Sequence, residues 1–307
     1  MKKIIGYLRT QLREDFDLSS YVIAGIFLAI SIIINYATDF NDNYVDAQPG
    51  MWRVLANFAF FGFAYFVPIV IRCAILREWS LLSAGFVFKS AFGILVLSLD
   101  SGFPYINEWL SKVPHAIHIW LFKVTINMMS GITVLLPIAL YHWFIEKNRC
   151  KTYGLGNTTF DWSPYLFMLL IMMPLIAGAA AFSEGFQHQY PMFPKTKAHE
   201  YLHVPKAFTI LTYEVAYGLD FITVELLFRG FFVVGMISLL GRRAILPMAT
   251  MYCYLHFGKP AGEAISSIFG GYVLGVIAYE TKSIWGGITV HVGIAWMMEI
   301  AAYLEEL

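Results

Sequence analysis

The first long apolar stretch, Y-V-I-A-G-I-F-L-A-I-S-I-I-I at residues 21–34, indicates the solvent of this protein because it contains no charged side chain. Comparable stretches recur near 52–71, 80–99, 117–142, 163–183, 204–240, 246–258, 263–279 and 283–304. A helix needs about 20 mostly apolar residues to cross a hydrocarbon core of about 30 Å. The pattern therefore predicts an all-α fold, a polytopic membrane helix bundle with about eight or nine transmembrane spans.

The composition supports the same conclusion, since 58% of the 307 residues are hydrophobic and 14% are charged. Soluble domains contain about 25% charged residues, so water is not the main solvent here. The 21 basic and 21 acidic residues balance, which predicts no nucleic-acid partner. Three widely spaced cysteines, Cys73, Cys150 and Cys253, match neither a disulfide framework nor a metal-ligand pattern.

Three segments can be distinguished along the chain. Residues 1–17 combine lysines and arginines with apolar residues at helical spacing, which predicts an amphipathic interfacial N-terminus. Residues 18–203 are expected to form an N-terminal transmembrane bundle, and residues 204–304 a second transmembrane domain. The stretch 204–240 is too long for one perpendicular crossing, so we expect a tilted or broken helix with Gly218 at the break.

The distribution of basic residues predicts the orientation. Of the 21 lysines and arginines, 12 fall in segments on the same side as the N-terminus and six on the opposite side. Positive residues are enriched in cytoplasmic segments. The N-terminus is therefore expected to be cytoplasmic.

Ionisable side chains within the spans are concentrated in the last third. Each costs about 2.5–3.5 kcal/mol at the bilayer centre, so such residues suggest function. The first five spans contain Lys89 and Lys123, which could reach an interface or pair internally. The stretch 210–300 contains the others: Glu214, Asp220, Glu225, Arg229, His256, Glu263, His291 and Glu299.

The segment V-E-L-L-F-R-G at 224–230 places Glu225 and Arg229 four residues apart on one helix face. Glu214 lies eleven residues before Glu225, on nearly the same face. Two interpretations stay open for the pair. It could be an ion pair that holds the bundle together, or part of a reactive site.

Two intramembrane histidines, His256 and His291, follow on separate predicted helices. Together with Glu225 they would suit general-base activation of water, with the histidines donating to an oxyanion. They would also suit a zinc site with one open position. The alternative is that each histidine is a hydrogen-bonded core residue without a chemical role.

The order E-x-x-x-R-G, aromatic-x-x-x-H and then H, over roughly residues 205–303, resembles the CPBP family. That family comprises the CAAX prenyl endopeptidases and bacteriocin-processing proteins, also called Abi. The resemblance implies an intramembrane endopeptidase in which a glutamate activates water and a histidine with an asparagine stabilises the oxyanion. Earlier accounts of the family described metalloproteases.

Carried over residue by residue, the resemblance implies catalytic roles for Glu225, Arg229, His256 and His291, with Asp220, Tyr252 and Glu214 as possible auxiliary residues. Two positions depart from the family pattern. Val224 stands where the family has its first glutamate, and Ala295 stands where it has the asparagine. Because valine cannot accept a proton, either Glu225 acts as the base, or another carboxylate supplies one, or proteolysis has been lost. Asp220, one turn before Val224, is the best substitute carboxylate.

The resulting prediction is an intramembrane endopeptidase that hydrolyses a peptide bond at or in the bilayer by glutamate-activated water. No cofactor is expected; the metalloprotease alternative would place zinc on Glu225, His256 and His291. The expected partners are membrane lipid and a peptide or membrane-protein substrate, in the bacterial inner membrane.

Two other functions stay open. One is a catalytically inactive relative that acts as a membrane binding or bacteriocin-immunity protein. The other is a transporter, which predicts inverted internal repeats that the sequence does not display.

Overall fold

The computed structural model describes residues 2–147, 152–156, 161–193 and 196–305, and within these ranges the chain forms helices and no strand. The α-helices are α1 (Lys2–Asp15), α2 (Leu18–Thr38), α3 (Met51–Leu76), α4 (Ala84–Gly102), α5 (Ile106–Trp109), α6 (His115–Ser130), α7 (Leu136–Tyr141), α8 (Ser163–Phe182), α9 (Glu184–Gln189), α10 (Ala198–Leu202), α11 (Lys206–Glu225), α12 (Ile237–Leu240), α13 (Ile245–Tyr254), α14 (Ala261–Thr281) and α15 (Trp285–Glu305). Four π-helical segments accompany them, at Asn41–Asp46, Gly131–Leu135, His142–Glu146 and Leu226–Phe231. Short 3-10 turns lie at Trp79–Leu81, Val234–Met236 and Gly241–Ala244.

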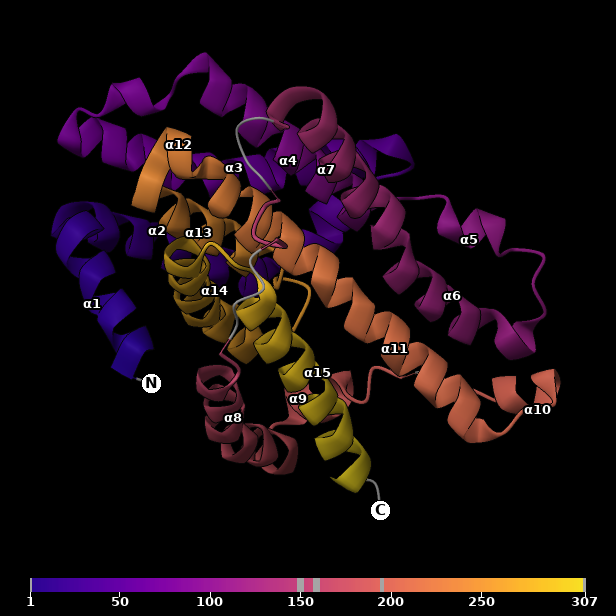
Figure 1. Cartoon of the computed structure of the whole chain (residues 1–307). Coiled ribbons are helices and arrows are strands. Elements are labelled where there is room, and N and C mark those ends of the chain that lie inside the picture. The colour runs from indigo at the N-terminus through magenta and orange to yellow at the C-terminus, as the bar shows by residue number, and fades with distance from the viewer. Residues whose placement is uncertain (1, 148–151, 157–160, 194–195, 306–307) are drawn as a thin grey trace.

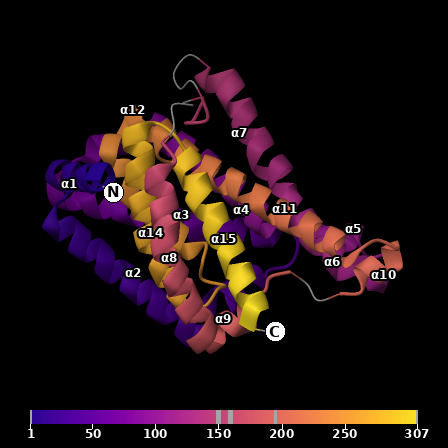
Figure 2. The same ribbon diagram turned by 60° about the horizontal axis from the view of Figure 1, so that its bottom comes forward.

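Among the described residues, eight helical segments are long and apolar enough to cross a membrane. They are α2, α3, α4, His115–Glu146, α8, Lys206–Tyr254, α14 and α15. Figures 1 and 2 show these helices gathered into one bundle. The predicted all-α polytopic membrane fold is confirmed.

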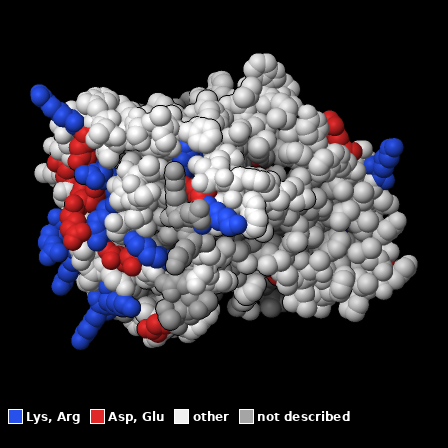
Figure 3. Space-filling model, turned by 45° about the horizontal axis from the view of Figure 1, so that its top comes forward, with Lys and Arg blue, Asp and Glu red and all other residues white. Residues whose placement is uncertain are grey.

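The outer surface of the bundle is apolar, as lipid requires. Large apolar side chains face outward on several spans, with Ile33 exposed to 67%, Phe144 to 76% and Phe182 to 90%. Figure 3 shows charged side chains gathered mainly at the end of the molecule where α1 and α12 lie, and a few at the opposite end. On the face that Figure 3 draws, one further group of charged side chains lies between these two ends, and the rest of the surface there is largely without charge, as expected for an integral membrane protein.

The expected break at Gly218 is wrong, because α11 runs without interruption through this residue. A Cβ at Gly218 would lie 3.0 Å from the ring of Trp296, so this glycine lets α15 approach α11 closely. The helix changes after Glu225 instead, where Phe232 N–H donates to the Leu227 carbonyl five residues earlier, at 3.0 Å. This π-helical register ends α11, and a series of short turns leads to α13.

Helix α13 lies at the centre of the bundle, packed against α3 and α14 (Figure 1). Helix α11 packs against α6 and α15, and α15 also packs against α8. This arrangement brings the ends of α11 and α13 and the first half of α15 into one region.

Lys89 pairs inside the protein, which decides between the two expectations for this residue. Its Nζ lies 2.6 and 2.7 Å from the two carboxylate oxygens of Glu146 and donates to the Gly235 carbonyl at 2.7 Å. Tyr153 Oη donates to Glu146 Oε2 at 2.6 Å. The buried ion pair therefore fastens α4 to the π-helical turn His142–Glu146 and to the turn that precedes α12.

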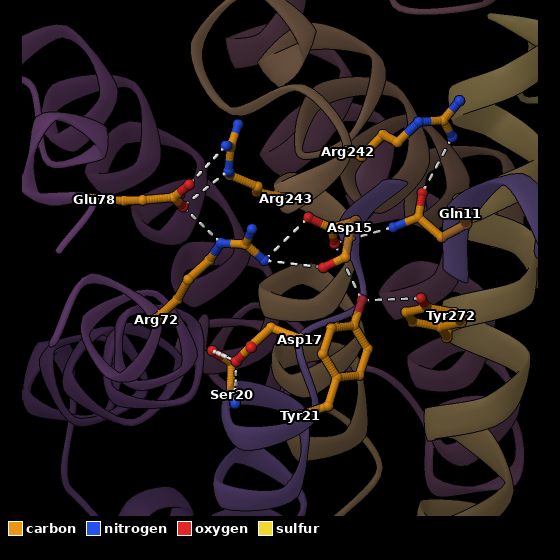
Figure 4. A network of polar contacts seen from close by, with 10 residues as sticks. All are labelled: Gln11, Asp15, Asp17, Ser20, Tyr21, Arg72, Glu78, Arg242, Arg243 and Tyr272. Carbon is orange, nitrogen blue, oxygen red and sulfur yellow. Dashed lines mark hydrogen bonds and ion pairs between the residues drawn. The ribbon is translucent and has the colours of Figure 1, made fainter. Parts of the chain in front are cut away.

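A second polar network ties the N-terminal helix to the rest of the chain at one end of the bundle (Figure 4). Arg72 contacts Asp15 at 3.0 Å and Glu78 at 2.8 Å, and Arg243 contacts Glu78 at 2.8 Å. Burial raises the pKa of Glu78, but the hydrogen bonds from Arg243 and Arg72 outweigh burial and hold that pKa below its usual value. These ion pairs join the α1–α2 corner, the end of α3 and the turn before α13.

The remaining expectations about the N-terminal segments are only partly addressed by the structure. Residues Lys2–Asp15 are helical, while their place at the membrane surface and the division of the chain at residues 17 and 204 stay predictions. Cys73 and Cys253 are buried free thiols, and Cys150 lies outside the described residues.

Candidate active site

The site begins where α11 ends. Glu225 is its last residue, and Arg229 lies in the π-helical turn that follows. Arg229 Nη1 lies 2.9 Å from Glu225 Oε1, and the two residues are 1% and 0% exposed. A buried carboxylate and guanidinium persist in such a place because each compensates the charge of the other. A π-helical turn interrupting a helix is frequently found at functional sites.

His291 joins this pair from α15. Its Nδ1 lies 3.0 Å from Glu225 Oε1, and its Nε2 lies 2.8 Å from the Tyr252 hydroxyl. Since an ionised carboxylate only accepts hydrogen bonds, Nδ1–H donates to Glu225 and Nε2 accepts from Tyr252 O–H in the neutral ring. Both ring nitrogens are therefore engaged, and His291 fixes the orientation of the carboxylate.

His256 approaches from the end of α13. Its Nδ1–H donates to the Tyr252 carbonyl at 2.9 Å, and its ring lies against the Tyr252 ring with centroids 4.6 Å apart. This bond directs Nε2 away from the α13 backbone. Among the contacts of the described residues, His256 is linked to Glu225 through Tyr252 and His291.

Tyr252 is the hub of the site, although the sequence indicated only an auxiliary role. Its ring lies under the Arg229 guanidinium at 4.4 Å, its hydroxyl bonds His291 and its carbonyl bonds His256. Its side chain is 4% exposed. The aromatic residue four positions before His256 was the sequence signal, since this spacing puts the two rings on one helix face.

The structure adds Gly287, which the sequence analysis did not single out. A Cβ at this position would overlap the Oε2 atom of Glu225. Gly287 lies four residues before His291 on α15, so the absence of a side chain there makes room for the carboxylate. The only signal in the sequence was the pair of adjacent glycines, Gly286 and Gly287, shortly before His291.

We expect Gly287→Ala to reduce the activity of the site strongly, by about 100-fold, because the methyl group would displace the Glu225 carboxylate and misplaced catalytic groups lose rate at this scale. The measurement is the initial rate of peptide cleavage, together with the melting temperature of each purified variant. Gly270→Ala is the matched control, since a Cβ there has no atom within 4 Å. Equal rates for the two variants would contradict the assigned position of Glu225.

Asp220 and Glu214 lie apart from this site for reasons of helix geometry. Five residues along an α-helix correspond to a rotation of about 140°, so Asp220 faces away from Glu225. It lies beside Asp100 and Ser130, and the Thr133 hydroxyl donates to Asp100. Glu214 is on nearly the same face as Glu225 but about 16 Å along the axis.

Glu214 belongs to a second polar cluster with Glu299 and Lys123. The Glu299 carboxylate accepts from the backbone N–H groups of Met192 at 2.7 Å and Phe193 at 3.2 Å. This cluster connects α6, α11 and α15 to the segment after α9. Lys123 is close enough to Glu299 for the two charges to interact, and whether its side chain pairs internally or reaches an interface stays a prediction.

The two departures from the family pattern lie in apolar surroundings. Ala295, four residues after His291, is 3% exposed and packs in a cluster with Trp120, Tyr213 and Phe221. Val224 is partly buried against the main hydrophobic core. Neither position can supply the carboxylate or amide that the family pattern has there.

The arrangement does not fit the zinc site considered from the sequence. Within the described part of the chain, no three His, Cys, Asp or Glu side chains are placed to hold a metal ion. His291 Nδ1 bonds Glu225 and His256 Nδ1 bonds a carbonyl, so these residues do not present three converging ligand atoms. That no cofactor is required stays a prediction.

Comparison with known proteins yields one family. Residues 206–297 match the model of the type II CAAX prenyl endopeptidase, Rce1-like family. The match covers less than a third of the chain and contains Glu225, Arg229, Tyr252, His256 and His291. No curated protein and no solved structure matches the chain.

Proposed function

Because residues 206–297 form an Rce1-like domain of the CPBP family, we propose that this integral membrane protein is an active endopeptidase that hydrolyses a peptide bond at or in the bilayer. The observation that supports this most is the Glu225 carboxylate, which is fully buried and held through Oε1 by Arg229 and His291. Its other oxygen, Oε2, has no hydrogen-bond partner among the described residues. A buried polar atom without a partner calls for an explanation, and here a reacting water would supply the partner.

In this proposal Glu225 Oε2 accepts a proton from the attacking water. Arg229 stabilises the carboxylate charge and His291 orients the group, so that Oε2 keeps a fixed position. Val224 is inert, and Asp220 takes no part in the proton transfer.

His256 is the proposed oxyanion donor. Its Nδ1–H is engaged by the Tyr252 carbonyl, so only Nε2 can face the substrate. Donation from Nε2 requires the ring to carry both protons, so His256 would enter the reaction as an imidazolium that has taken its second proton from bulk water. The proton of the attacking water goes to Glu225 Oε2 and from there to the leaving amine. The tetrahedral intermediate would then be stabilised by a charged donor.

We further propose a bacterial inner-membrane location with a cytoplasmic N-terminus. The support is the excess of lysines and arginines in segments on the side of the N-terminus. The substrate would be a peptide or a membrane protein that presents an extended segment to this domain.

A second candidate is a catalytically inactive relative that binds a membrane peptide, for example in immunity to a bacteriocin. The apolar surroundings of Val224 and Ala295 favour it, because two polar groups of the family pattern have no replacement at those positions. The same experiment distinguishes the two candidates.

The test is cleavage of a set of membrane-inserted peptides, including some that end in a CAAX sequence, by purified protein in liposomes, with fragments identified by mass. We expect wild-type cleavage and a loss of about 100-fold or more in His256→Ala, the size typical of removing an oxyanion donor. His115→Ala, an exposed position at the start of α6, is the control. Wild-type protein that retains a peptide without cleaving it would support the inactive relative.

A further inference from the structure

A separate apolar pocket lies between α2, the π-helical segment Asn41–Asp46, α3 and α13. Its cavity volume is about 460 Å³, within the range of roughly 300–1,000 Å³ that is typical of ligand pockets. Apolar side chains line most of it, among them Ile34, Phe40, Ala59, Phe63 and Tyr254. None of the proposed catalytic residues lines it.

Apart from Tyr44, which is 58% exposed, the polar side chains of the lining already have partners. Tyr254 Oη donates to Ser31 Oγ at 2.7 Å, and Asn35 Nδ2 donates to the Phe257 carbonyl at 3.0 Å. Asn35 Oδ1 accepts from the Asn41 backbone N–H at 3.0 Å. These bonds occupy most of the polar atoms, so the mostly apolar pocket favours a hydrocarbon ligand.

The rim of the pocket is continuous with the lipid-facing surface of the bundle. Beside it, Ile30, Ile33 and Leu55 are exposed to 52%, 67% and 54%, and the lining residue Phe63 is itself exposed to 57%. A lipid chain can therefore enter from the bilayer without crossing water. We propose that this pocket binds one acyl chain of a bilayer lipid.

The occupied pocket would act on the loop that carries His256. Tyr254 and Phe257 flank His256 and stack on each other with centroids 4.5 Å apart. From α2, Asn35 holds the Phe257 carbonyl, and Tyr36 Oη donates to the Lys259 carbonyl at 2.7 Å. The bound acyl chain would hold α2 against this loop and so restrict the movement of His256. This effect on His256 rests on the proposed function, whereas lipid binding does not depend on it.

Photolabelling of the unmodified protein tests the binding. The protein is placed in phosphatidylcholine vesicles that contain a phosphatidylcholine with a mid-chain diazirine, and labelled peptides are mapped after irradiation. Because the acyl chain leaves lipid and not water, packing contacts in the pocket must hold it. We expect about tenfold more label on the α3 peptide with Ala59 and Phe63 than on lipid-facing α8, a preference that corresponds to about 1.4 kcal/mol. Equal labelling of α3 and α8 would overturn the proposal.

A variant with a filled pocket provides the second test. In Ala59→Trp the indole would occupy the space of the acyl chain, and Ala177→Trp places the same side chain on the exposed surface of α8. Bulk lipid is removed with detergent, and native mass spectrometry measures the fraction of protein molecules that still carry one lipid. We expect most molecules of the wild type and of Ala177→Trp to carry one, and a fraction about tenfold smaller for Ala59→Trp, which corresponds to about 1.4 kcal/mol. If Ala59→Trp retains as much lipid as the wild type, the proposal is overturned. It is also overturned if a prenylated peptide reduces photolabelling of the pocket and unlabelled phosphatidylcholine does not. Pocket labelling in a protein that cleaves nothing would uphold lipid binding while removing the proposed function.

Discussion

Glu225→Gln is expected to lower the rate of peptide cleavage by about 1,000-fold or more, because an amide cannot accept the proton of the attacking water. Glutamine has the same shape, and its carbonyl oxygen can still accept from His291 Nδ1–H. The fold and substrate binding should therefore persist, so kcat falls while KM changes little. The measurement is the initial rate over a range of peptide concentrations.

The matched control for this prediction is Glu214→Gln, the same replacement on the same helix. Glu214 lies in the cluster with Glu299 and Lys123, so its variant should stay within about threefold of the wild-type rate. Asp220→Asn examines the alternative base that the sequence suggested. If Asp220→Asn is inactive while Glu225→Gln still cleaves, Asp220 is the base and the assignment of Glu225 is wrong.

The spans of this protein could be predicted from the sequence because their cause is local. A segment that crosses lipid must be long, apolar and internally hydrogen-bonded, and these requirements appear in the residues themselves. The turn after Glu225 has a tertiary cause instead. Gly218 invited a break, yet α11 continues there because the glycine packs against Trp296, and the helix ends at a π-helical turn within the buried core.

The candidate site shows the same limit. Motif spacing indicated that Glu225, Arg229, His256 and His291 act together. The structure brings Glu225, Arg229 and His291 into contact, and a shared catalytic role for the four residues stays a prediction. The atoms that pair across different helices could not be read from spacing. For that reason the central place of Tyr252 and the contact of Gly287 with Glu225 appeared only in three dimensions.

The largest effect on stability is expected at Lys89, far from the reacting atoms in sequence. Lys89→Met should lower the free energy of unfolding by about 3–5 kcal/mol, because it leaves the Glu146 carboxylate buried without its counter-charge. Lys89 is 1% exposed, so water cannot replace the ammonium without rearrangement of α4. The measurement is unfolding of the purified protein in detergent, followed by circular dichroism.

The double variant Lys89→Met and Glu146→Gln shows whether Lys89→Met destabilises the protein by leaving the Glu146 carboxylate unpaired or by removing the packing of the lysine side chain. With both charges removed, most of the lost stability should return, since a neutral pair has no uncompensated charge and Tyr153 can still hydrogen-bond the new amide. Lys112→Met, at an exposed position before α6, should change unfolding by less than about 0.5 kcal/mol. If the double variant is as unstable as Lys89→Met alone, the ion pair is not what fastens α4 to the turn before α12.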